Sequence, residues 1–245
     1  MKLASEFIQL PLRLDIALLQ LEVSSFEEHE WGPHPQGYAG NKALPLVSTG
    51  DKSNANYSGT MSASSALERS PYLQQVLASF NTVIGRSRLM RLEPGGSVPP
   101  HSDTNYAWRQ RIRIHIPIVT DPDVVFTSCD NCEVHMQAGE AWIFDNWRMH
   151  AVANNSQIQR IHLVVDTTGS SRFWAMARKG RDSRVSSGFA DANLQELVYR
   201  SAPPEQSSGL QFERHNAHLI SPPGEVDKLI QEYLEEVSYL AEAEI

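Results

Sequence analysis

The sequence is poor in cysteine, in basic charge and in long apolar runs. Two cysteines among 245 residues, Cys129 and Cys132, cannot build a disulfide framework. Lys and Arg number 21 and Asp and Glu 29, so the formal net charge of −8 lacks the basic excess of nucleic-acid-binding proteins. No uncharged apolar run approaches the roughly 20 residues of a membrane-spanning helix, and Glu6, Arg13 and Asp15 interrupt the unbroken apolar core that a signal peptide needs. We therefore expect a soluble, cytoplasmic protein that binds neither membranes nor nucleic acid.

The two cysteines form one CxxC pair, in TSCDNCEV. A zinc knuckle would need two further ligands at similar spacing, and only His135 stands nearby. We interpret the pair as a turn that carries two reduced thiols. The composition, with 41% hydrophobic and 20% charged residues, is that of an ordinary globular protein and excludes a disordered or fibrous chain.

Short apolar runs separated by turn signals predict a mainly β fold between residues 86 and 168. The runs are RLMRLEPGG, RIRIHIPIV, GEAWIFDN and QRIHLVVD. Helices are predicted on both sides of this region: an amphipathic helix within residues 8–30, a second over 70–80 with Ser70 as its N-cap, and a third over 222–245. This pattern favours a β-sandwich or barrel with flanking helices.

Residues 31–65 are rich in Gly, Pro, Asn and Ser, and they are too many for a simple connection. A disordered surface insertion and an ordered binding loop both fit this composition. Trp31, Tyr38 and Tyr57 favour the ordered, functional loop.

Two of the predicted strands have one aliphatic and one polar face, because side chains alternate along a strand. In RIRIHIPIV the isoleucines share one face, and Arg111, Arg113, His115 and Pro117 share the other. In QRIHLVVD an arginine and a histidine again lie opposite an aliphatic face. The polar faces can meet solvent, or they can line a basic cavity that binds a small anion inside a small barrel. The pattern leaves both possibilities open.

A candidate metal site begins at His101 and Asp103, which are separated by one residue in PGGSVPPHSD. In an extended segment this spacing places both side chains on one face, where they can chelate one ion. His150 follows the strand GEAWIFD and is the expected third ligand. Two histidines and one carboxylate form the facial triad of non-haem Fe(II) oxygenases, which leaves positions open for a co-substrate and O₂. Taken alone, His101 also fits a loop histidine beside an acidic N-cap.

Arg160 adds an anion-binding group to this set. It follows His150 along the chain and lies on the polar face of the next predicted strand. A hairpin between the two residues would return Arg160 to the cavity that holds the metal. Its guanidinium fork matches both oxygens of a carboxylate. The sequence therefore predicts three metal ligands and one carboxylate-binding arginine in one cavity.

Taken together, these blocks resemble the aspartyl/asparaginyl β-hydroxylase family of 2-oxoglutarate- and Fe(II)-dependent dioxygenases, and they are similar also to bacterial proline cis-hydroxylases. The blocks are PGGSVPPHSD, RIRIHIPI, HMQAGEAWIFDNWRMHAV and QRIHLVVD, within residues 85–170. The implied fold is a double-stranded β-helix, a jelly-roll or cupin-like core. The chain after residue 175 lacks this resemblance, so we expect a dioxygenase domain over residues 1–175 and a partly helical C-terminal extension over 176–245.

Carried onto this chain, the resemblance implies that His101, Asp103 and His150 hold Fe(II). It implies that Arg160 binds the C5 carboxylate of the co-substrate 2-oxoglutarate. The implied reaction uses O₂ to hydroxylate an unactivated C–H bond of an amino acid, which is free, peptidyl or carrier-bound. It is coupled to decarboxylation of 2-oxoglutarate, with release of succinate and CO₂.

His115 and Arg113 match the R-x-H block that helps to hold the co-substrate in this family. Asp145 or Asn146 can orient the nearby imidazole of His150. For Asp145 a turn position at the end of a strand is an equally good interpretation.

The membrane-linked vertebrate members of the family have Gly where this chain has Asp103. This chain is therefore closer to three-ligand oxygenases and to the small bacterial hydroxylases. Candidate substrate contacts are Arg148 and the residues after the HxD pair, namely Asn105, Tyr106, Trp108 and Arg109. The alternative function is a non-catalytic, cupin-like sensor that binds a metal and a small acid. The sequence does not predict the oligomeric state.

Overall fold

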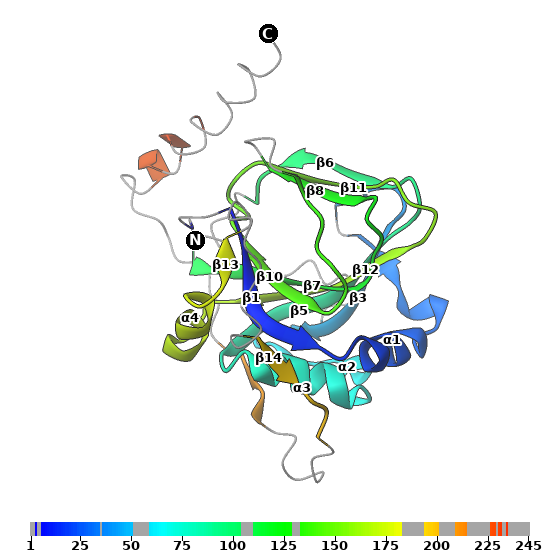
Figure 1. Cartoon of the computed structure of the whole chain (residues 1–245), viewed down its shortest axis with the longest axis vertical. Coiled ribbons are helices and arrows are strands. Elements are labelled where there is room, and N and C mark those ends of the chain that lie inside the picture. Colours follow the sequence, from blue (N-terminus) through cyan, green and yellow to red (C-terminus); the bar gives the residue numbers. More distant parts are fainter. Residues whose placement is uncertain are drawn as a thin grey trace.

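Among the described residues, eight strands form the core of two facing sheets in the computed structural model. Figure 1 shows the two sheets. The structure describes residues 3, 6–34, 36–50, 59–103, 110–128, 133–182, 194–200 and 209–214, with positions 226–228, 230, 231 and 234. The eight strands are β5 (Val83–Leu92), β6 (Ser97–His101), β7 (Ile112–Val119), β8 (Val124–Ser128), β9 (Glu133–Val134), β10 (Glu140–Phe144), β11 (His150–Asn154) and β12 (Arg160–Thr167).

The chain crosses repeatedly between the two sheets. The large sheet contains the order β10-β7-β12-β5, and the small sheet has the order β6-β11-β8-β9. All of these neighbours are antiparallel. This topology is a double-stranded β-helix, or jelly roll, so the predicted core is confirmed.

Strands from the N-terminal part of the chain widen the large sheet. They are β1 (Phe7–Leu14), β2 (Gly32–Pro33), β3 (Asn41–Ser48) and β4 (Ser62–Ala63). β1 pairs with β10, β3 pairs with β5, and β2 lies at the end of the sheet beyond β3. The segment 31–65 is therefore ordered wherever the structure describes it; Tyr57 lies outside the described residues.

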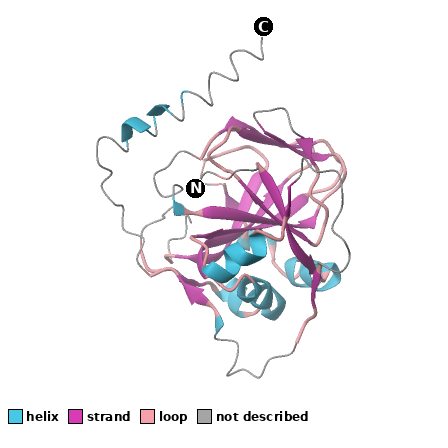
Figure 2. Ribbon diagram, turned by 60° about the vertical axis from the view of Figure 1, so that its left-hand side comes forward, coloured by secondary structure: helices cyan, strands magenta, loops and turns pink. Residues whose placement is uncertain are grey.

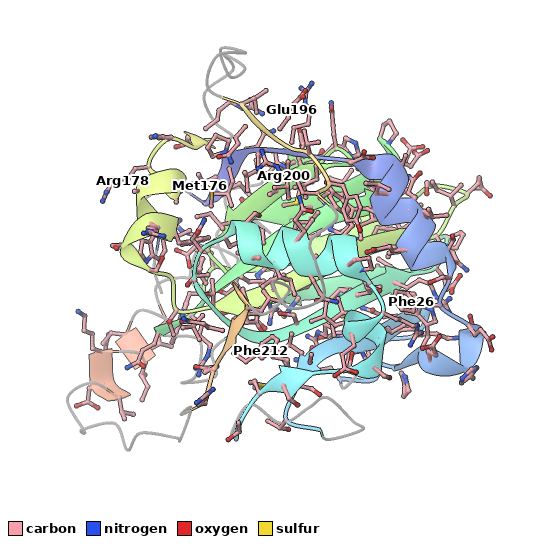
Figure 3. The ribbon with its side chains drawn as sticks, turned by 90° about the horizontal axis from the view of Figure 1, so that it is seen from below. Phe26, Met176, Arg178, Glu196, Arg200 and Phe212 are labelled. Atoms are coloured by element: carbon pink, nitrogen blue, oxygen red, sulfur yellow. The ribbon has the colours of Figure 1, made fainter. Side chains whose placement is uncertain are left out.

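Helices cover the outer face of the large sheet, on the side away from the small sheet (Figures 1, 2 and 3). They are α1 (Ile16–Ser24), α2 (Ser65–Glu68) and α3 (Pro71–Ser79), with the short 3₁₀ helix η1 (Glu28–Glu30) after α1 and with α4 (Ser171–Ala177) beside β1. α1 begins where the Asp15 side chain accepts a hydrogen bond from the N–H of Leu18. α3 begins as predicted, with Ser70 at the N-cap and Pro71 in the first turn.

The two faces of the large sheet bury different side chains. The isoleucines of β7 pack toward the helices, in a core that includes Leu19 and Leu77. A second core between the sheets includes Phe126 and Phe144. The polar side chains of β7 and β12 therefore point between the sheets, where Arg113 and others line a cavity. The structure confirms the cavity interpretation of the alternating strands rather than the solvent-facing one.

The chain beyond α4 returns to the large sheet. β13 (Arg181–Asp182) and β14 (Gln195–Leu197) pair with β1, and β15 (Gln211–Phe212) pairs with β5. The described positions between 226 and 234 are helical, while most of the predicted C-terminal helix lies outside the described residues. The domain division at residue 175 stays a prediction. No helix in the described part of the chain is both long enough and apolar enough to cross a membrane.

Candidate active site

Two histidines meet where the small sheet ends. His101 closes β6 and His150 opens β11, and the two residues are direct partners in the antiparallel ladder. Their ring centroids are 4.3 Å apart. Asp103 follows two residues after His101, and its backbone N–H donates to the Asn146 carbonyl at 2.9 Å. The structure thus places the three residues that the sequence predicts as metal ligands at the same end of the small sheet.

The hydrogen bonds of the two histidines define which ring nitrogen has a lone pair for a metal ion. Nδ1 of His101 is 2.9 Å from the Pro99 carbonyl oxygen, and Nδ1 of His150 is 2.8 Å from the Arg148 carbonyl oxygen. A carbonyl oxygen only accepts, so each Nδ1 carries the proton and each Nε2 keeps a lone pair. Burial lowers the pKa of His150 to about 4, although Asp103 opposes this shift. Both features suit a neutral imidazole that ligates a metal through Nε2.

The carboxylate of Asp103 is held by two neighbours. Its Oδ2 accepts hydrogen bonds from Arg113 Nη1 at 2.8 Å and from Asn146 Nδ2 at 3.3 Å. Burial would raise the pKa of Asp103, but Arg113 foremost among its charged neighbours holds that pKa below its usual value. Asp103 is therefore an ionised carboxylate with one oxygen positioned by the protein.

Arg113 is itself held from the other side. Its Nε donates to Asp166 Oδ1 at 2.9 Å, and the other oxygen of Asp166 forms an ion pair with Arg86 Nε at 3.6 Å. Acidic and basic groups therefore alternate from Asp103 through Arg113 and Asp166 to Arg86. Arg113, Asp166 and Arg86 are buried, so removing one of them would leave a buried charge without compensation.

Arg160 lies in the interior at the start of β12. It is only 3% exposed, and its guanidinium carbon lies 5.2 Å from the centroid of the Phe126 ring. Among the described residues no carboxylate forms an ion pair with it, and burial lowers its pKa to about 9. A buried cation without a counter-charge is costly, so this position fits a bound anion.

A cavity of about 440 Å³ connects these groups between the two sheets. Its described lining includes four arginines and one acidic residue, Asp103. His115 also lines it, and neither ring nitrogen of His115 has a hydrogen-bond partner in the described part of the protein. Burial, followed by Arg160 and Arg113, lowers the pKa of His115 well below its usual value. The cavity is therefore basic, and His115 presents a neutral imidazole to it.

The sequence missed one wall of this cavity. Arg86 and Arg88 of β5 and four residues from the segment around the β2–β3 connection belong to its lining: His34, Gln36, Tyr38 and Asn41. The arginines gave no signal because β5 is buried on both faces, so its sequence shows no alternation of apolar and polar residues. The composition of segment 31–65 predicts a functional loop, but of these four lining residues it identifies only Tyr38.

The structure also bears on the candidate positioning and substrate residues. Asn146 contacts Asp103, whereas Asp145 accepts hydrogen bonds from the backbone N–H groups of Leu3 at 2.7 Å and Trp147 at 3.2 Å, as a turn residue does. Arg148 forms an ion pair with Glu6 at 3.2 Å. Four further candidate contacts and both cysteines lie outside the described residues: Asn105, Tyr106, Trp108, Arg109, Cys129 and Cys132.

A bound metal ion requires its ligands to surround one point. Across the described ranges, no group of three or more His, Cys, Asp or Glu side chains is spaced closely enough to form a metal site. The chemistry of the donors nevertheless fits a metal, because two imidazoles with free Nε2 atoms and one ionised carboxylate lie at the same end of the cavity.

The fold and the site define a jelly-roll protein with a basic interior cavity and a two-histidine, one-carboxylate set at its end. Residues 17–169 match the family described as Aspartyl/Asparaginyl beta-hydroxylase, and the chain belongs to this family. The resemblance seen in the sequence motifs is thereby confirmed, and the match extends further toward the N-terminus than the motifs indicated.

Two curated relatives are proline hydroxylases. The L-proline cis-4-hydroxylase of Rhizobium meliloti (strain 1021) is 29% identical over 98 residues, which cover 39% of this chain and 35% of that protein. The L-proline cis-3-hydroxylase 1 of a Streptomyces species is 31% identical over 113 residues, which cover 43% of this chain and 38% of that protein. The chain thus spans little more than a third of the length of the curated relatives it matches.

Among solved structures, a prolyl-4-hydroxylase from Pseudomonas putida superposes with a TM-score of 0.47 at 13% identity, covering 69% of this chain and 95% of that one. An oxidoreductase of the 2OG-Fe(II) oxygenase family from Burkholderia pseudomallei gives a TM-score of 0.46 at 12% identity, with 64% and 80% coverage.

Proposed function

We propose that the protein is a 2-oxoglutarate- and Fe(II)-dependent dioxygenase that hydroxylates an unactivated C–H bond of an amino acid. The substrate is free, peptidyl or carrier-bound, and succinate and CO₂ are the further products. The observation that carries the proposal is the buried Arg160, which lacks a carboxylate partner among the described residues and faces the cavity that holds the His–Asp–His set.

His101, Asp103 and His150 would hold Fe(II), through the Nε2 atoms of the histidines and a carboxylate oxygen of Asp103. When bound together, Fe(II), 2-oxoglutarate and O₂ supply the oxidising chemistry. The protein keeps both imidazoles in the ligating tautomer by means of the Pro99 and Arg148 carbonyls.

Arg160 would bind the C5 carboxylate of 2-oxoglutarate as a charge-assisted, two-pronged contact. The His115 ring packs against Phe126, over which Arg160 lies, and against Phe144, which packs on His150. We propose that the His115 imidazole contacts the co-substrate. Arg113 is also proposed as a co-substrate contact. Its ion pairs with Asp103 and Asp166 give it a further role, which is to hold the Asp103 carboxylate in place.

The names of the family and of both curated relatives favour an enzyme over the alternative, a non-catalytic sensor of a metal and a small acid. The two differ in one measurable reaction. The enzyme forms succinate from 2-oxoglutarate only with Fe(II) and O₂, whereas a sensor binds 2-oxoglutarate without consuming it.

The test is O₂-dependent succinate release across a panel of free amino acids and short peptides. The Arg160→Met variant is compared with Arg178→Met, which removes an exposed arginine on the surface near the end of α4. We expect succinate release that rises with one panel member, that persists in Arg178→Met and that is lost in Arg160→Met. Retained 2-oxoglutarate binding without any succinate would overturn the proposal in favour of the sensor.

A further inference from the structure

One wall of the cavity combines a histidine, an asparagine and an arginine that the roles above do not use. His34 and Asn41 face each other across the β2–β3 pair, where the His34 N–H donates to the Asn41 carbonyl at 3.1 Å. Arg88 comes from β5, which neighbours β3 in the large sheet. All three line the cavity, and each is more than nine-tenths buried.

His34 presents a hydrogen-bond donor to this wall. Its Nδ1 accepts a hydrogen bond from the backbone N–H of Gln36 at 3.2 Å, so the proton of the neutral ring is on Nε2. Burial foremost, and then the positive charges of Arg88, Arg113 and Arg86, lower the pKa of His34 to about 3. The ring is therefore neutral at physiological pH, and it lies close to the guanidinium of Arg88.

Asn41 presents an acceptor beside this donor. Its side-chain Oδ1 is buried and has no hydrogen-bond partner among the described residues. Residues opposite each other on antiparallel strands have Cβ atoms about 5 Å apart, so the side chains of Asn41 and His34 start from neighbouring positions on the cavity wall. A buried acceptor without a hydrogen-bond donor lowers the stability of the folded protein unless an N–H or O–H group of a ligand donates to it.

The wall is connected to the metal end through a row of aromatic rings. The Tyr38 ring stacks on His34 with centroids 5.3 Å apart, and it lies 6.2 Å from the His101 ring. A molecule of amino-acid size held at His34 can therefore extend along Tyr38 to His101. Arg160, the proposed 2-oxoglutarate-binding residue, lies over Phe126 of the small sheet.

We propose that this wall is the substrate site: Arg88 and His34 Nε2–H bind a carboxylate of the substrate, and Asn41 Oδ1 accepts a hydrogen bond from its amino group. This inference rests on the proposed function and names its substrate class as amino acids with a free carboxylate. The carboxylate is either the α-carboxylate or that of an acidic side chain, because both present the same two oxygens to Arg88.

Binding is measured first, by calorimetric titration of L-amino acids into the protein loaded with Mn(II) and 2-oxoglutarate without O₂. Each acid is paired with its α-amide, and the α-amides of aspartate and glutamate distinguish a side-chain carboxylate from an α-carboxylate. We expect at least one acid to bind and the amide that lacks the recognised carboxylate to bind roughly ten- to hundredfold more weakly, because a charged hydrogen bond is lost.

Two variants test whether Arg88 and His34 bind the substrate carboxylate. Arg88→Gln removes the charge, and His34→Phe keeps the ring that stacks on Tyr38 but removes the donor. Both should weaken binding of the acid, and raise its KM in the succinate assay, by roughly ten- to hundredfold. Neither should change the affinity for 2-oxoglutarate. Arg178→Gln is the matched control and should leave both affinities unchanged; Arg178 lies on the outside of the molecule (Figure 3).

Because Arg88 lies in a buried strand, its variant can fail to fold, and thermal unfolding identifies that case. His34 follows the short β2 at the end of the sheet, where a substitution disturbs the fold less. If Arg88→Gln does not fold, binding is therefore tested with His34→Phe. If no acid binds, if amides bind as well as acids, or if the folded variants bind the acid normally, the substrate site is wrong. If the wild-type protein does not bind 2-oxoglutarate, it is the proposed function that fails.

Discussion

Arg113 donates from Nη1 to Oδ2 of Asp103 across 2.8 Å, and from Nε to Asp166 across 2.9 Å. One guanidinium thus joins the carboxylate predicted as a metal ligand to a second, fully internal carboxylate. Such an arrangement fixes which Asp103 oxygen is left for a metal. It also supplies the positive charge that keeps Asp103 ionised in a buried place.

Replacing Arg113 with Gln should weaken metal binding. Without the guanidinium, burial raises the pKa of Asp103, and its carboxylate loses its fixed orientation. We expect Mn(II) affinity to fall by roughly 10- to 100-fold, the usual cost of losing an outer hydrogen-bonding partner of a ligand. Titration followed by electron paramagnetic resonance measures this directly.

Two further variants serve as controls for this measurement. Arg113→Lys keeps the charge but cannot reach both carboxylates with one fork, so an intermediate affinity is expected. Arg178→Gln should bind Mn(II) like the wild type. Equal affinities in Arg113→Gln and the wild type would show that Arg113 does not position the ligand.

Asp166→Asn should mainly affect stability. The change removes a carboxylate that is 2% exposed and that pairs with both Arg113 and Arg86. Two buried guanidinium groups then lose a counter-charge, so we expect the free energy of unfolding to fall by about 3–5 kcal/mol. Urea unfolding measures the loss. Mn(II) affinity should fall less than in Arg113→Gln, because Arg113 still reaches Asp103. A larger loss of Mn(II) affinity in Asp166→Asn than in Arg113→Gln would contradict this prediction.

Arg160→Met should stabilise the protein without ligands while abolishing 2-oxoglutarate binding. The variant replaces a buried cation with an apolar side chain of similar length, which is expected to raise the free energy of unfolding by about 1–4 kcal/mol. Binding of 2-oxoglutarate should raise the free energy of unfolding of the wild-type protein and so offset this difference. It should not raise the free energy of unfolding of the variant. Urea unfolding with and without 2-oxoglutarate tests both parts. A destabilised variant that still responds to 2-oxoglutarate would show that Arg160 is a structural residue.

The strands and the His–Asp–His grouping could be predicted because they depend on local sequence. Alternation along β7 and β12 separates two faces in any sheet, and the one-residue spacing of His101 and Asp103 puts both on one side of an extended segment. Alternation does not say what covers each face. Only the packing of α1 and α3 on the isoleucines shows that the polar face is internal.

The wall formed by His34, Asn41 and Arg88 could not be predicted for a different reason. His34 and Asn41 belong to a turn-rich segment without periodicity, and they reach the cavity because β3 pairs with β5, which follows much later in the chain. The pairing of Asp166 with Arg113 likewise depends on the register between β12 and β7. Contacts of this kind follow from tertiary structure and leave no pattern in neighbouring residues.

Buried neutral histidines should make the protein without metal sensitive to acid. In the unfolded chain a histidine takes up a proton below pH about 6.5. In the folded chain burial lowers the pKa of His34 to about 3 and that of His150 to about 4. Between pH 4 and 6.5 the unfolded chain therefore binds more protons, and the free energy of unfolding falls as the pH is lowered. Each such histidine contributes about 1.4 kcal/mol per pH unit.

His34→Phe tests the size of this effect at one position. The variant removes one of the groups that only the unfolded chain protonates, so its free energy of unfolding should fall less steeply between pH 6 and pH 4.5, by about 1.4 kcal/mol per pH unit. Urea unfolding at several pH values, with a metal chelator present, gives the two slopes. Replacement of His29, whose side chain is exposed on the surface, is the control and should leave the slope unchanged. If the slopes of His34→Phe and the wild type are the same, folding does not lower the pKa of His34, and this prediction is wrong.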